Sequence, residues 1–311
     1  MSEQRQLLTD MAEGLFAELA GSDTPWPRLA EAGFATLLVA DDKGGFGGDW
    51  GDLFAVLRLA GAHALAAPLG ETIVAHRVLS DAGVTPPEGP IGLLDGEHVA
   101  HGRDCSAVLA PGKFLPAAIC DWHEASGPDG MPRDRLGGIE GFEAAIATNA
   151  DLHALGAFCV VAQAAGALEA GFALAIEHVN TRVQFGKPLA KFQAVQQALA
   201  EASEHVVAVA AAGQAAAAAL DCGDASFEIP AAKLRTNLAI DAAVPILHRV
   251  HGAIGFTMEY PLNRYTRRLM GWRSAFGNDA YWARRLGQQV AHFGGSGLWR
   301  VIAARGDRRP G

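Results

Sequence analysis

The chain has 311 residues, and its 25 Lys and Arg against 34 Asp and Glu leave a net charge of −9 at pH 7. Proteins that bind nucleic acid need a basic face for the phosphates, so this balance argues against nucleic acid as the main partner. Hydrophobic residues make up 50% of the chain, and many of them are alanine, the strongest helix former. We therefore expect a mainly helical protein.

The first 83 residues show the periodicity of a helical unit. Apolar residues recur at helical spacing, and turn residues separate the segments. This pattern predicts helices over residues 3–20, 26–32, 49–63 and 72–81. We expect residues 1–83 to form an N-terminal helical domain.

Residues 84–148 are rich in proline and glycine, and their apolar runs are short. Such runs, bounded by turn residues, are typical of a small sheet. The runs cover residues 91–94, 107–110, 117–120 and 144–147. We expect residues 84–148 to form a small β domain.

The helical pattern returns in residues 149–311 and persists almost to the end. Long helices are expected over residues 151–181, 191–221, 230–250 and 278–304, which together predict a four-helix bundle. Glycines at positions 156, 166 and 171 indicate that the first of these helices crosses its neighbours closely. The predicted fold class is mainly α: a helical domain, a small β domain and a C-terminal helical bundle.

The four cysteines are far apart, form no CxxC pair, and are expected to be reduced thiols in a cytoplasmic protein. The polar start of the chain, MSEQRQLLTD, lacks the apolar segment of a signal peptide. No apolar run approaches the roughly 20 residues needed to span a bilayer, so no membrane span is expected. The eleven histidines do not cluster at metal-binding spacing, and no metal site is predicted.

The stretch Arg182–Ala200 places a polar loop between two long helices. Arg182 ends the first helix, where its guanidinium could grip a pyrophosphate with two hydrogen bonds. Alternatively, Arg182 complements the negative end of that helix, and spacing alone favours this simpler role. Gln184 and Gln193 could add hydrogen bonds to a bound ligand.

A second stretch, His248–Arg268, interrupts a helix at HGAIG, residues 251–255. A planar ring could lie on this small-residue surface, but a glycine cap followed by a turn is as consistent. Glu259 could act as an acid or base, although a single glutamate in such a turn more often has a structural role. Arg264, Arg267 and Arg268 are expected to form a solvated face or to pair with another subunit.

Together these stretches resemble the acyl-CoA dehydrogenase family of flavoproteins, and the resemblance covers nearly the whole chain. The segment Leu29–Gly48 is similar to the family's "LaelGl…vpee.GGlG" motif, and PLGET (Pro68–Thr72) follows it as expected. RVQFGKPLAKFQAVQQALA resembles "RxxFGkpl..fQ.vq..lA", and HGAIGFTMEYPL resembles "hGg.Gf..eyp". The family fold of helical domain, β domain and helical bundle agrees with the pattern along this chain.

The resemblance implies FAD as cofactor and an acyl-CoA thioester as substrate. A carboxylate in the family removes the proton alpha to the thioester carbonyl, and the beta hydrogen leaves as hydride to the flavin. The resemblance also implies contacts with the FAD bound by a neighbouring subunit, in two groups. These are Arg182, Val183, Gln184, Phe185, Phe192 and Gln193, and then Arg249, Val250, His251, Gly252 and Ala253. Arg249 stands where the family usually has glutamine.

The catalytic glutamate of the family is missing. Its usual position, 17 residues after Glu259, is Phe276, which cannot accept a proton. Some members carry the base at the start of the first bundle helix, where this chain has His153, and histidine can act as a base in principle. The β domain also lacks the family's acidic segment and its tryptophan–threonine flavin strand.

The leading hypothesis is therefore a base-lacking subunit that completes the FAD site of a dehydrogenase-like partner in a hetero-oligomer. One alternative is a self-sufficient dehydrogenase, in a homo- or hetero-oligomer, with His153 or Glu259 as the relocated base. Another is a scaffold protein that kept the fold and lost the chemistry.

Overall fold

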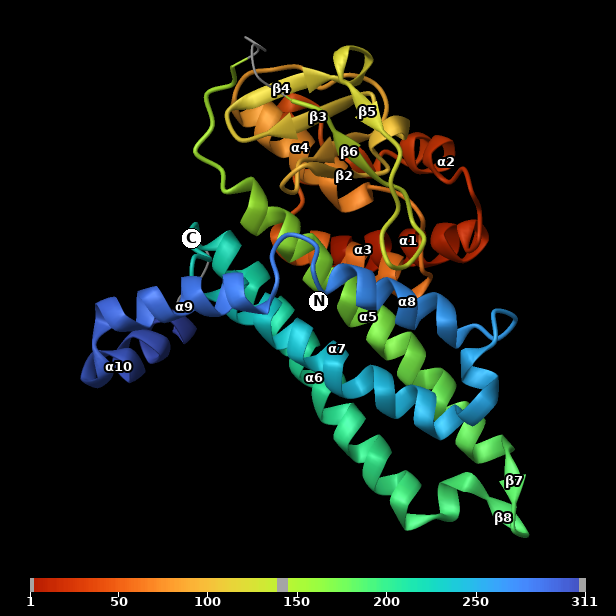
Figure 1. Ribbon diagram of the computed structural model, residues 1–311. Helices are drawn as coiled ribbons and strands as arrows, with labels where there is room; N and C mark the ends of the chain where they lie inside the picture. Colours follow the sequence, from red (N-terminus) through yellow and green to blue (C-terminus); the bar gives the residue numbers. More distant parts are fainter. Residues whose placement is uncertain (1–2, 139–144, 308–311) are drawn as a thin grey trace.

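The computed structural model describes residues 3–138 and 145–307 of the chain. It has an N-terminal helical unit, a small β unit and a long helical C-terminal unit (Figure 1). The N-terminal helices are α1 (Glu3–Leu19), α2 (Trp26–Glu31), α3 (Trp50–Ala62) and α4 (Leu69–Asp81). All four helices predicted here are confirmed, and α4 begins three residues earlier than expected.

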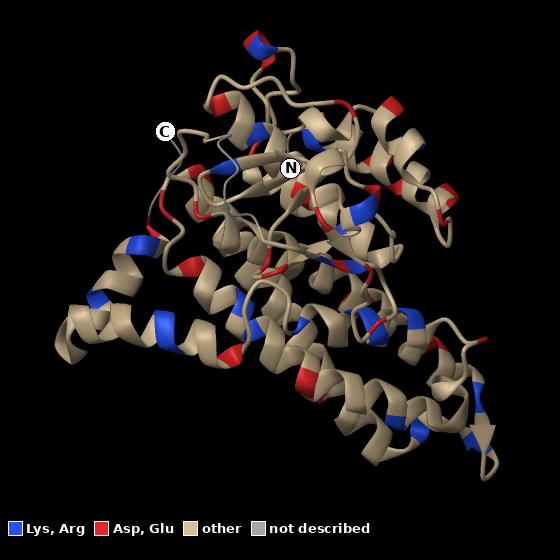
Figure 2. Ribbon diagram, turned by 45° about the horizontal axis from the view of Figure 1, so that its top comes forward, with Lys and Arg blue, Asp and Glu red and all other residues tan. Residues whose placement is uncertain are grey.

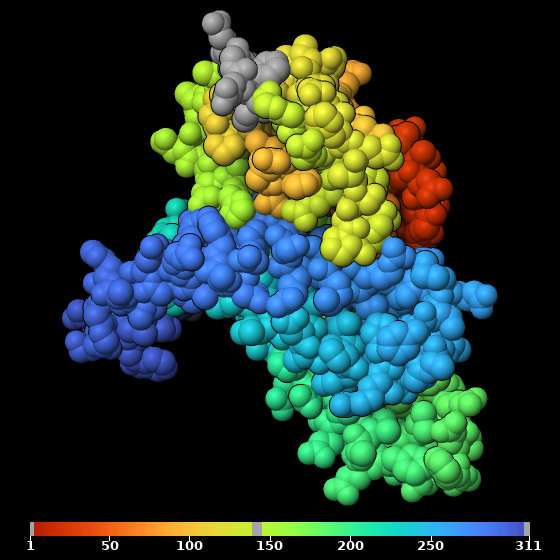
Figure 3. Space-filling view, viewed as in Figure 1, coloured from red at the N-terminus to blue at the C-terminus, as the bar shows by residue number. Residues whose placement is uncertain are grey.

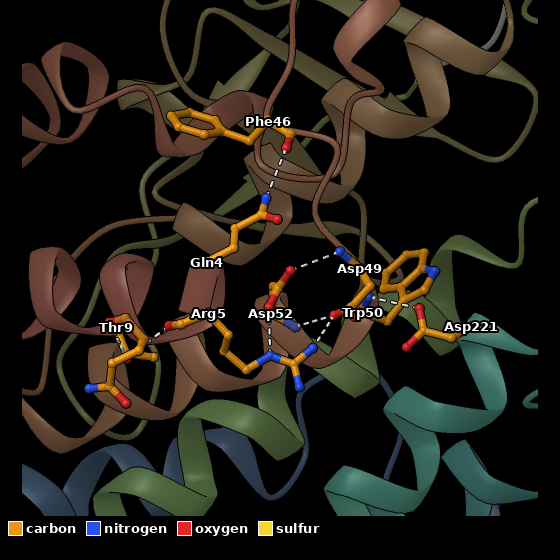
Figure 4. Close-up of polar contacts among 9 residues, drawn as sticks. Gln4, Arg5, Thr9, Phe46, Asp49, Trp50, Asp52 and Asp221 are labelled. Carbon is orange, nitrogen blue, oxygen red and sulfur yellow. Dashed lines mark hydrogen bonds and ion pairs between the residues drawn. The ribbon is translucent and has the colours of Figure 1, made fainter. Parts of the chain in front are cut away.

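A cluster of ion pairs and caps joins α1, α3 and the end of a later helix (Figure 4). Asp49 caps α3 by accepting a hydrogen bond from the Asp52 N–H at 2.7 Å. From α1, the Arg5 guanidinium contacts Asp49 at 2.5 Å and Asp52 at 2.6 Å. The Trp50 N–H donates to Asp221 Oδ1 at 2.9 Å, which ties the start of α3 to the C-terminal unit.

Among its described residues, 84–138 and 145–148, the β unit holds two three-stranded sheets, whereas one small sheet was expected. β1 (Ile91–Leu93), β3 (Ala107–Ala110) and β4 (Lys113–Pro116) form the first, in which β1 and β3 are parallel. β2 (His98–Ala100), β6 (Arg133–Leu136) and β5 (Trp122–His123) form the second, which is antiparallel throughout.

Two of the four predicted strand runs, 91–94 and 107–110, are confirmed within one residue. The run 117–120 is wrong, because residues 117–119 close a 3-10 turn in which the Cys120 N–H donates to Ala117 O at 3.2 Å. Of the run 144–147, residue 144 lies outside the described residues, and Ala145 makes a single bridge to Lys113.

The C-terminal unit contains more helices than the four expected. α5 (Leu152–Thr181), α6 (Gln193–Asp221) and α7 (Glu228–His251) match predictions, and a small hairpin of β7 (Val183–Gln184) and β8 (Lys187–Pro188) joins α5 to α6. A further helix, α8 (Leu262–Trp272), was not predicted. The last predicted helix is two, α9 (Asp279–Phe293) and α10 (Gly295–Gly306), because Gly294 adopts φ 72° and ψ 155° between them.

Helix α5 forms the centre of the molecule. By length and composition it could cross a bilayer, contrary to the expectation from apolar runs, but 67% of its most apolar window is buried inside the protein. It packs against α3, α6, α7 and α8. A Cβ atom on Gly166 would lie 1.7 Å from the Arg58 carbonyl oxygen of α3, so the expected close crossing occurs here. α5 is therefore the core helix of a folded protein.

A cofactor-sized cleft and a closed catalytic position

An open cleft lies at the hairpin end of the bundle. It has a volume of about 670 Å³ and is bounded by the end of α5, the β7–β8 hairpin, the start of α6, and the 3-10 turn Gly252–Phe256 that follows α7. Its walls are His178, Arg182, Gln184, Leu189, Ala194, Val195, Ala198, Arg249, Val250, His251, Gly252, Ala253 and Ile254. This volume is within the 300–1,000 Å³ range of small-molecule and cofactor sites.

The fold brings together residues of the two predicted stretches, such as Arg182 and Arg249, which are 67 positions apart in sequence. Seven of the expected FAD contacts line this cleft: Arg182, Gln184, Arg249, Val250, His251, Gly252 and Ala253. The remaining four, Val183, Phe185, Phe192 and Gln193, lie outside its walls. Val183 and Phe185 are on the exposed hairpin, where Phe185 is 90% exposed. The Phe192 ring packs edge-on against Phe185, with 6.2 Å between the ring centres.

The positive charge of the cleft comes from Arg182 and Arg249. Arg182 is the C-cap of α5, and its backbone N–H donates to His178 O at 2.9 Å. Within residues 3–138 and 145–307, neither guanidinium has a carboxylate oxygen within ion-pair distance. Lys and Arg also gather around the hairpin end of the bundle (Figure 2). Two arginines without acidic partners can bind an anionic group such as a pyrophosphate.

Stacked histidines form the back of the cleft. The rings of His178 and His251 stack with 4.7 Å between their centres, and Tyr260 packs against His251 at 5.1 Å. Burial is the main cause that lowers the pKa of both histidines, so they are neutral at pH 7. The sequence analysis did not single out His178, although its position four residues before Arg182, one helical turn away, could have indicated it.

At the family's usual base position, Phe276 is a buried core residue. Its side chain is 4% exposed, and its ring lies directly against the Cα of Gly156 in α5. The backbone N–H of Phe276 donates to Asp95 Oδ2 at 2.8 Å, and its carbonyl accepts from Trp282 Nε1 at 2.8 Å. Its φ of 49° is unusual for a bulky residue. The position is thus fixed by contacts from three elements.

Only a small cavity remains beside Phe276. Its volume is about 80 Å³, well below the range of cofactor sites, and Glu71, Asp95, Gln163 and Arg133 line it together with other residues. A loop of the β unit, residues 127–133, forms one wall. In this conformation the cavity has no room for a flavin ring or an acyl chain.

Arg268 of α8 stabilises this closed arrangement through its hydrogen bonds. Its guanidinium donates to the Leu65 carbonyl and, at 3.3 Å, to Met131 Sδ of the loop. Burial lowers its pKa to about 10. The expectation of a solvated or intersubunit arginine is wrong for Arg268, which is 8% exposed, because the β-unit loop packs onto α8 and covers it. Arg264 is exposed, as expected.

The two candidate bases lie outside both spaces. His153 sits in the first turn of α5, where its ring stacks on Trp282 and lies 3.9 Å from Asp95 Oδ1. Burial lowers its pKa, with Asp95 acting in the opposite direction. Glu259 is exposed in the turn before α8. Neither residue lines the cleft or the cavity.

No group of three His, Cys, Asp or Glu side chains that could hold a metal ion occurs in the described part of the chain. The four cysteines are free thiols, two of them buried. The open cleft and the closed cavity contain the positions to which the resemblance points.

Known proteins are similar to this chain in sequence and fold. The family model "Acyl-CoA dehydrogenase, C-terminal domain" matches residues 141–291. The chain is 25% identical over 317 residues to acyl-CoA dehydrogenase IpdE2 of Mycobacterium tuberculosis, covering 93% of this chain and 98% of the relative. It is 26% identical to IpdE2 of Mycolicibacterium smegmatis, covering 93% and 100%.

Among solved structures, the fold is similar to a chain of the ChsE4-ChsE5 complex from Mycobacterium tuberculosis, with a TM-score of 0.80, 20% identity, and coverage of 94% and 98% of the two chains. The Tcur3481-Tcur3483 steroid ACAD variant gives a TM-score of 0.81 at 20% identity. The family model, the relatives matched over nearly their whole length, and the two motif-bearing stretches agree. Residues 141–291 match the C-terminal domain of the acyl-CoA dehydrogenase family, and the two relatives that match over 93% of the chain are acyl-CoA dehydrogenases.

Proposed function

We propose that this chain is the base-lacking subunit of a heteromeric acyl-CoA dehydrogenase. It completes the FAD site of a partner chain, and the partner supplies the catalytic carboxylate. The observation that carries the proposal is the contrast between two spaces in one chain. The cleft at Arg182 and Arg249 is open, whereas the catalytic position at Phe276 is closed to about 80 Å³.

The open cleft fits the adenosine and pyrophosphate half of FAD. Arg182 and Arg249 would hold the pyrophosphate by charge-assisted hydrogen bonds, and Gln184 would donate or accept one more. Gly252 has nothing within 4 Å of an added Cβ, so a planar ring has room above this glycine. FAD, when bound, supplies the hydride acceptor. The cleft residues bind and orient the FAD. The four predicted contacts outside the cleft walls would touch the FAD, or the partner chain that carries it, only in the complex.

The same contrast between the open cleft and the filled position supports a hetero-oligomer. One wall of the FAD site is present on this chain, and the wall that would face the flavin ring and the acyl group is filled by Phe276 and Arg268. A second chain must therefore provide the surface that contacts the flavin ring and the acyl group. The similar ChsE4-ChsE5 and Tcur3481-Tcur3483 structures are complexes of two different chains, and the second is named a steroid ACAD. We infer that the substrate is an acyl-CoA thioester with a steroid-derived acyl group, oxidised in the cytoplasm.

The test compares the chain alone with the chain co-purified with a second acyl-CoA dehydrogenase-like chain from the same organism. The lone chain is expected to lack stoichiometric flavin and to leave acyl-CoA unoxidised. The complex is expected to carry one FAD per pair of chains. Replacing Arg182 by Ala should raise the FAD dissociation constant of the complex on the order of tenfold to a hundredfold, because a charge-assisted pair is lost.

The exposed Lys191→Ala, outside the cleft walls, is the matched control for loss of a positive charge. A lone chain that holds flavin and oxidises an acyl-CoA would refute the base-lacking role. A complex that stays colourless would support the scaffold alternative.

A further inference from the structure

His178 lies on the wall of the open cleft, one helical turn before Arg182. Figures 1 and 3 show this end of the bundle, where the green hairpin region lies next to the light-blue segment that follows α7. The half-buried His178 ring stacks on His251, with 4.7 Å between the ring centres and 26° between the ring planes. Because His178 also lines the cleft, the remainder of its ring can contact a bound ligand.

The two stacked rings differ in how readily they can carry a charge. His251 is 5% exposed, and its Nδ1 lies 2.7 Å from the Leu247 carbonyl oxygen. Since a carbonyl oxygen only accepts, Nδ1 of His251 carries the hydrogen, and its buried Nε2 has no hydrogen-bond partner in the described structure. A charge on His251 would therefore be poorly solvated. The half-buried His178 is the better position for a proton, and two charged rings at this distance would repel each other.

The surroundings of His178 disfavour a proton in the free chain. Burial is the main cause that lowers its pKa, and His251 and Arg182 act in the same direction. Across residues 3–138 and 145–307, no carboxylate oxygen lies within ion-pair distance of the ring, and the neighbouring Glu177 is exposed.

The other elements around the cleft add mainly positive charge. From α6, the cleft wall has only Ala194, Val195 and Ala198, which do not titrate. The charged and titratable groups near His178 are Glu177 and Arg182 on α5, Lys187 on the hairpin, Lys191 after it, His248, Arg249 and His251 on α7, and Glu259 and Tyr260 in the turn before α8.

We propose that His178 takes up a proton when the pyrophosphate of FAD binds in the cleft, so that the cleft holds this cofactor more tightly at lower pH. This proton uptake presupposes the proposed function, because the anion beside Arg182 is taken to be the pyrophosphate. Two negative phosphate groups offset the charges of Arg182 and Arg249 and then attract an imidazolium one helical turn away. His178 is thus a proton-linked binding residue of the cleft.

The direction of the pH effect follows from linkage. Without a ligand, His178 is neutral at pH 7, because its surroundings lower its pKa from 6.5. A bound anion raises this pKa again. At any pH between the two pKa values, binding takes up a proton, and the affinity rises as the pH falls. Below the pKa of the free chain the proton is bound in both states, and the affinity becomes constant.

NMR titration of the full chain with ADP-ribose tests the proposal. ADP-ribose carries the adenosine and the pyrophosphate of FAD. Its pyrophosphate is esterified at both ends, so it lacks the terminal phosphate group that titrates near about pH 6. The affinity is expected to be on the order of fivefold to tenfold higher at about pH 6 than at about pH 8. The Cε1–H signal of His178 should report a higher pKa with ADP-ribose than without it.

His178→Gln removes the titrating ring and keeps a polar side chain that favours a helix. It is expected to lose the pH dependence and to bind at both pH values about as the unmodified chain binds at the higher one. His292→Gln, at an exposed position of α9, is the matched control and should keep the pH dependence. Both variants retain the general effect of acid on the net charge, so their difference reports on His178.

His178→Lys carries a charge at both pH values and is expected to bind tightly at both. Circular dichroism checks that the variants remain folded. The proposal is overturned if the unmodified chain binds ADP-ribose equally at the two pH values, or if His178→Gln keeps the pH dependence. Either result would leave the proposed function intact. The absence of ADP-ribose binding at both pH values would instead contradict the cleft as an FAD site, and with it both proposals.

Discussion

Glu71 has the least favourable environment of the acidic side chains around the closed cavity. It lies on α4, is 6% exposed, and its Oε2 has no hydrogen-bond partner in the described structure. Burial raises its pKa from 4.5 to about 7. Burial is also the main cause that raises the pKa of the Cys105 and Cys159 thiols, and the negative charge of Glu71 adds to this effect. A carboxyl group in such surroundings is more stable with its proton than without it.

This carboxyl makes the stability of the fold depend on pH. Because the pKa of the Glu71 carboxyl is higher in the folded than in the unfolded state, its contribution to stability is fully present below pH 4.5. This contribution is lost as the pH rises from 4.5 through about 7. Glu71→Gln cannot ionise. Relative to this variant, the unmodified protein is expected to lose about 2–3 kcal/mol of unfolding free energy between about pH 5 and pH 8.

Urea unfolding at a series of pH values measures this difference. The exposed Glu201→Gln serves as control and should follow the unmodified protein. Parallel pH profiles for Glu71→Gln and the unmodified protein would show that Glu71 gains a partner in solution.

At the scale of elements, the crossing of α3 and α5 depends on two glycines. A Cβ on Gly61 of α3 would lie 1.9 Å from the Gln163 carbonyl oxygen, and a Cβ on Gly166 would lie 1.7 Å from that of Arg58. Both neighbours are backbone atoms, which cannot rotate away. The two helices are therefore in backbone contact, which the glycine at position 166 indicated and the sequence analysis did not foresee for Gly61.

Gly166→Ala is expected to lower the unfolding free energy by about 3 kcal/mol, the upper part of the usual range for overpacking, because α3 and α5 must separate. Gly14→Ala is the matched control on α1, where nothing lies within 4 Å of the added Cβ. The control should stabilise the protein by roughly 0.5–1 kcal/mol, since alanine is the better helix former. Chemical denaturation of the two variants measures both effects, and equal stability of the two would contradict the backbone contact.

Helix periodicity predicted the long helices well. It missed the short helix α8 and the break between α9 and α10. α8 was overlooked because only two of its large apolar residues, Leu262 and Leu269, are buried, while Thr266 and Arg268 take other buried positions. The break between α9 and α10 depends on a single backbone conformation at Gly294. Glycine also occurs inside long helices here, as at Gly166, so the residue type alone does not distinguish a break from a close crossing.

At the scale of the whole molecule, the two halves of the site differed in how far the sequence could predict them. The cleft is built from two continuous stretches, each with a recognisable pattern, and seven of their residues meet in space. The sequence showed that the family's glutamate is missing at Phe276, but it did not show that the space beside this position is filled. This closure depends on contacts between Asp95 and Phe276, 181 positions apart, and between Leu65 and Arg268, 203 positions apart.

That closure predicts that restoring the missing residue will not restore the chemistry. In Phe276→Glu, the new carboxyl would replace a 4% exposed ring next to Gly156, with no space for an acyl group beside it. The variant is expected to lose at least about 3 kcal/mol of unfolding free energy, the usual cost of removing a buried phenylalanine. Its complex should still carry one FAD per pair of chains.

Thermal unfolding and anaerobic flavin reduction by acyl-CoA check the two parts of this prediction. Phe276→Leu keeps an apolar side chain and should retain the flavin content and turnover of the unmodified complex. A lone Phe276→Glu chain that binds flavin and is reduced by acyl-CoA would mean that the loop of residues 127–133 opens readily. In that case, the change from glutamate to Phe276 alone would account for the loss of catalysis. If the lone variant remains colourless, the loop and Arg268 prevent catalysis even without Phe276, and activity requires a partner whose own site is open.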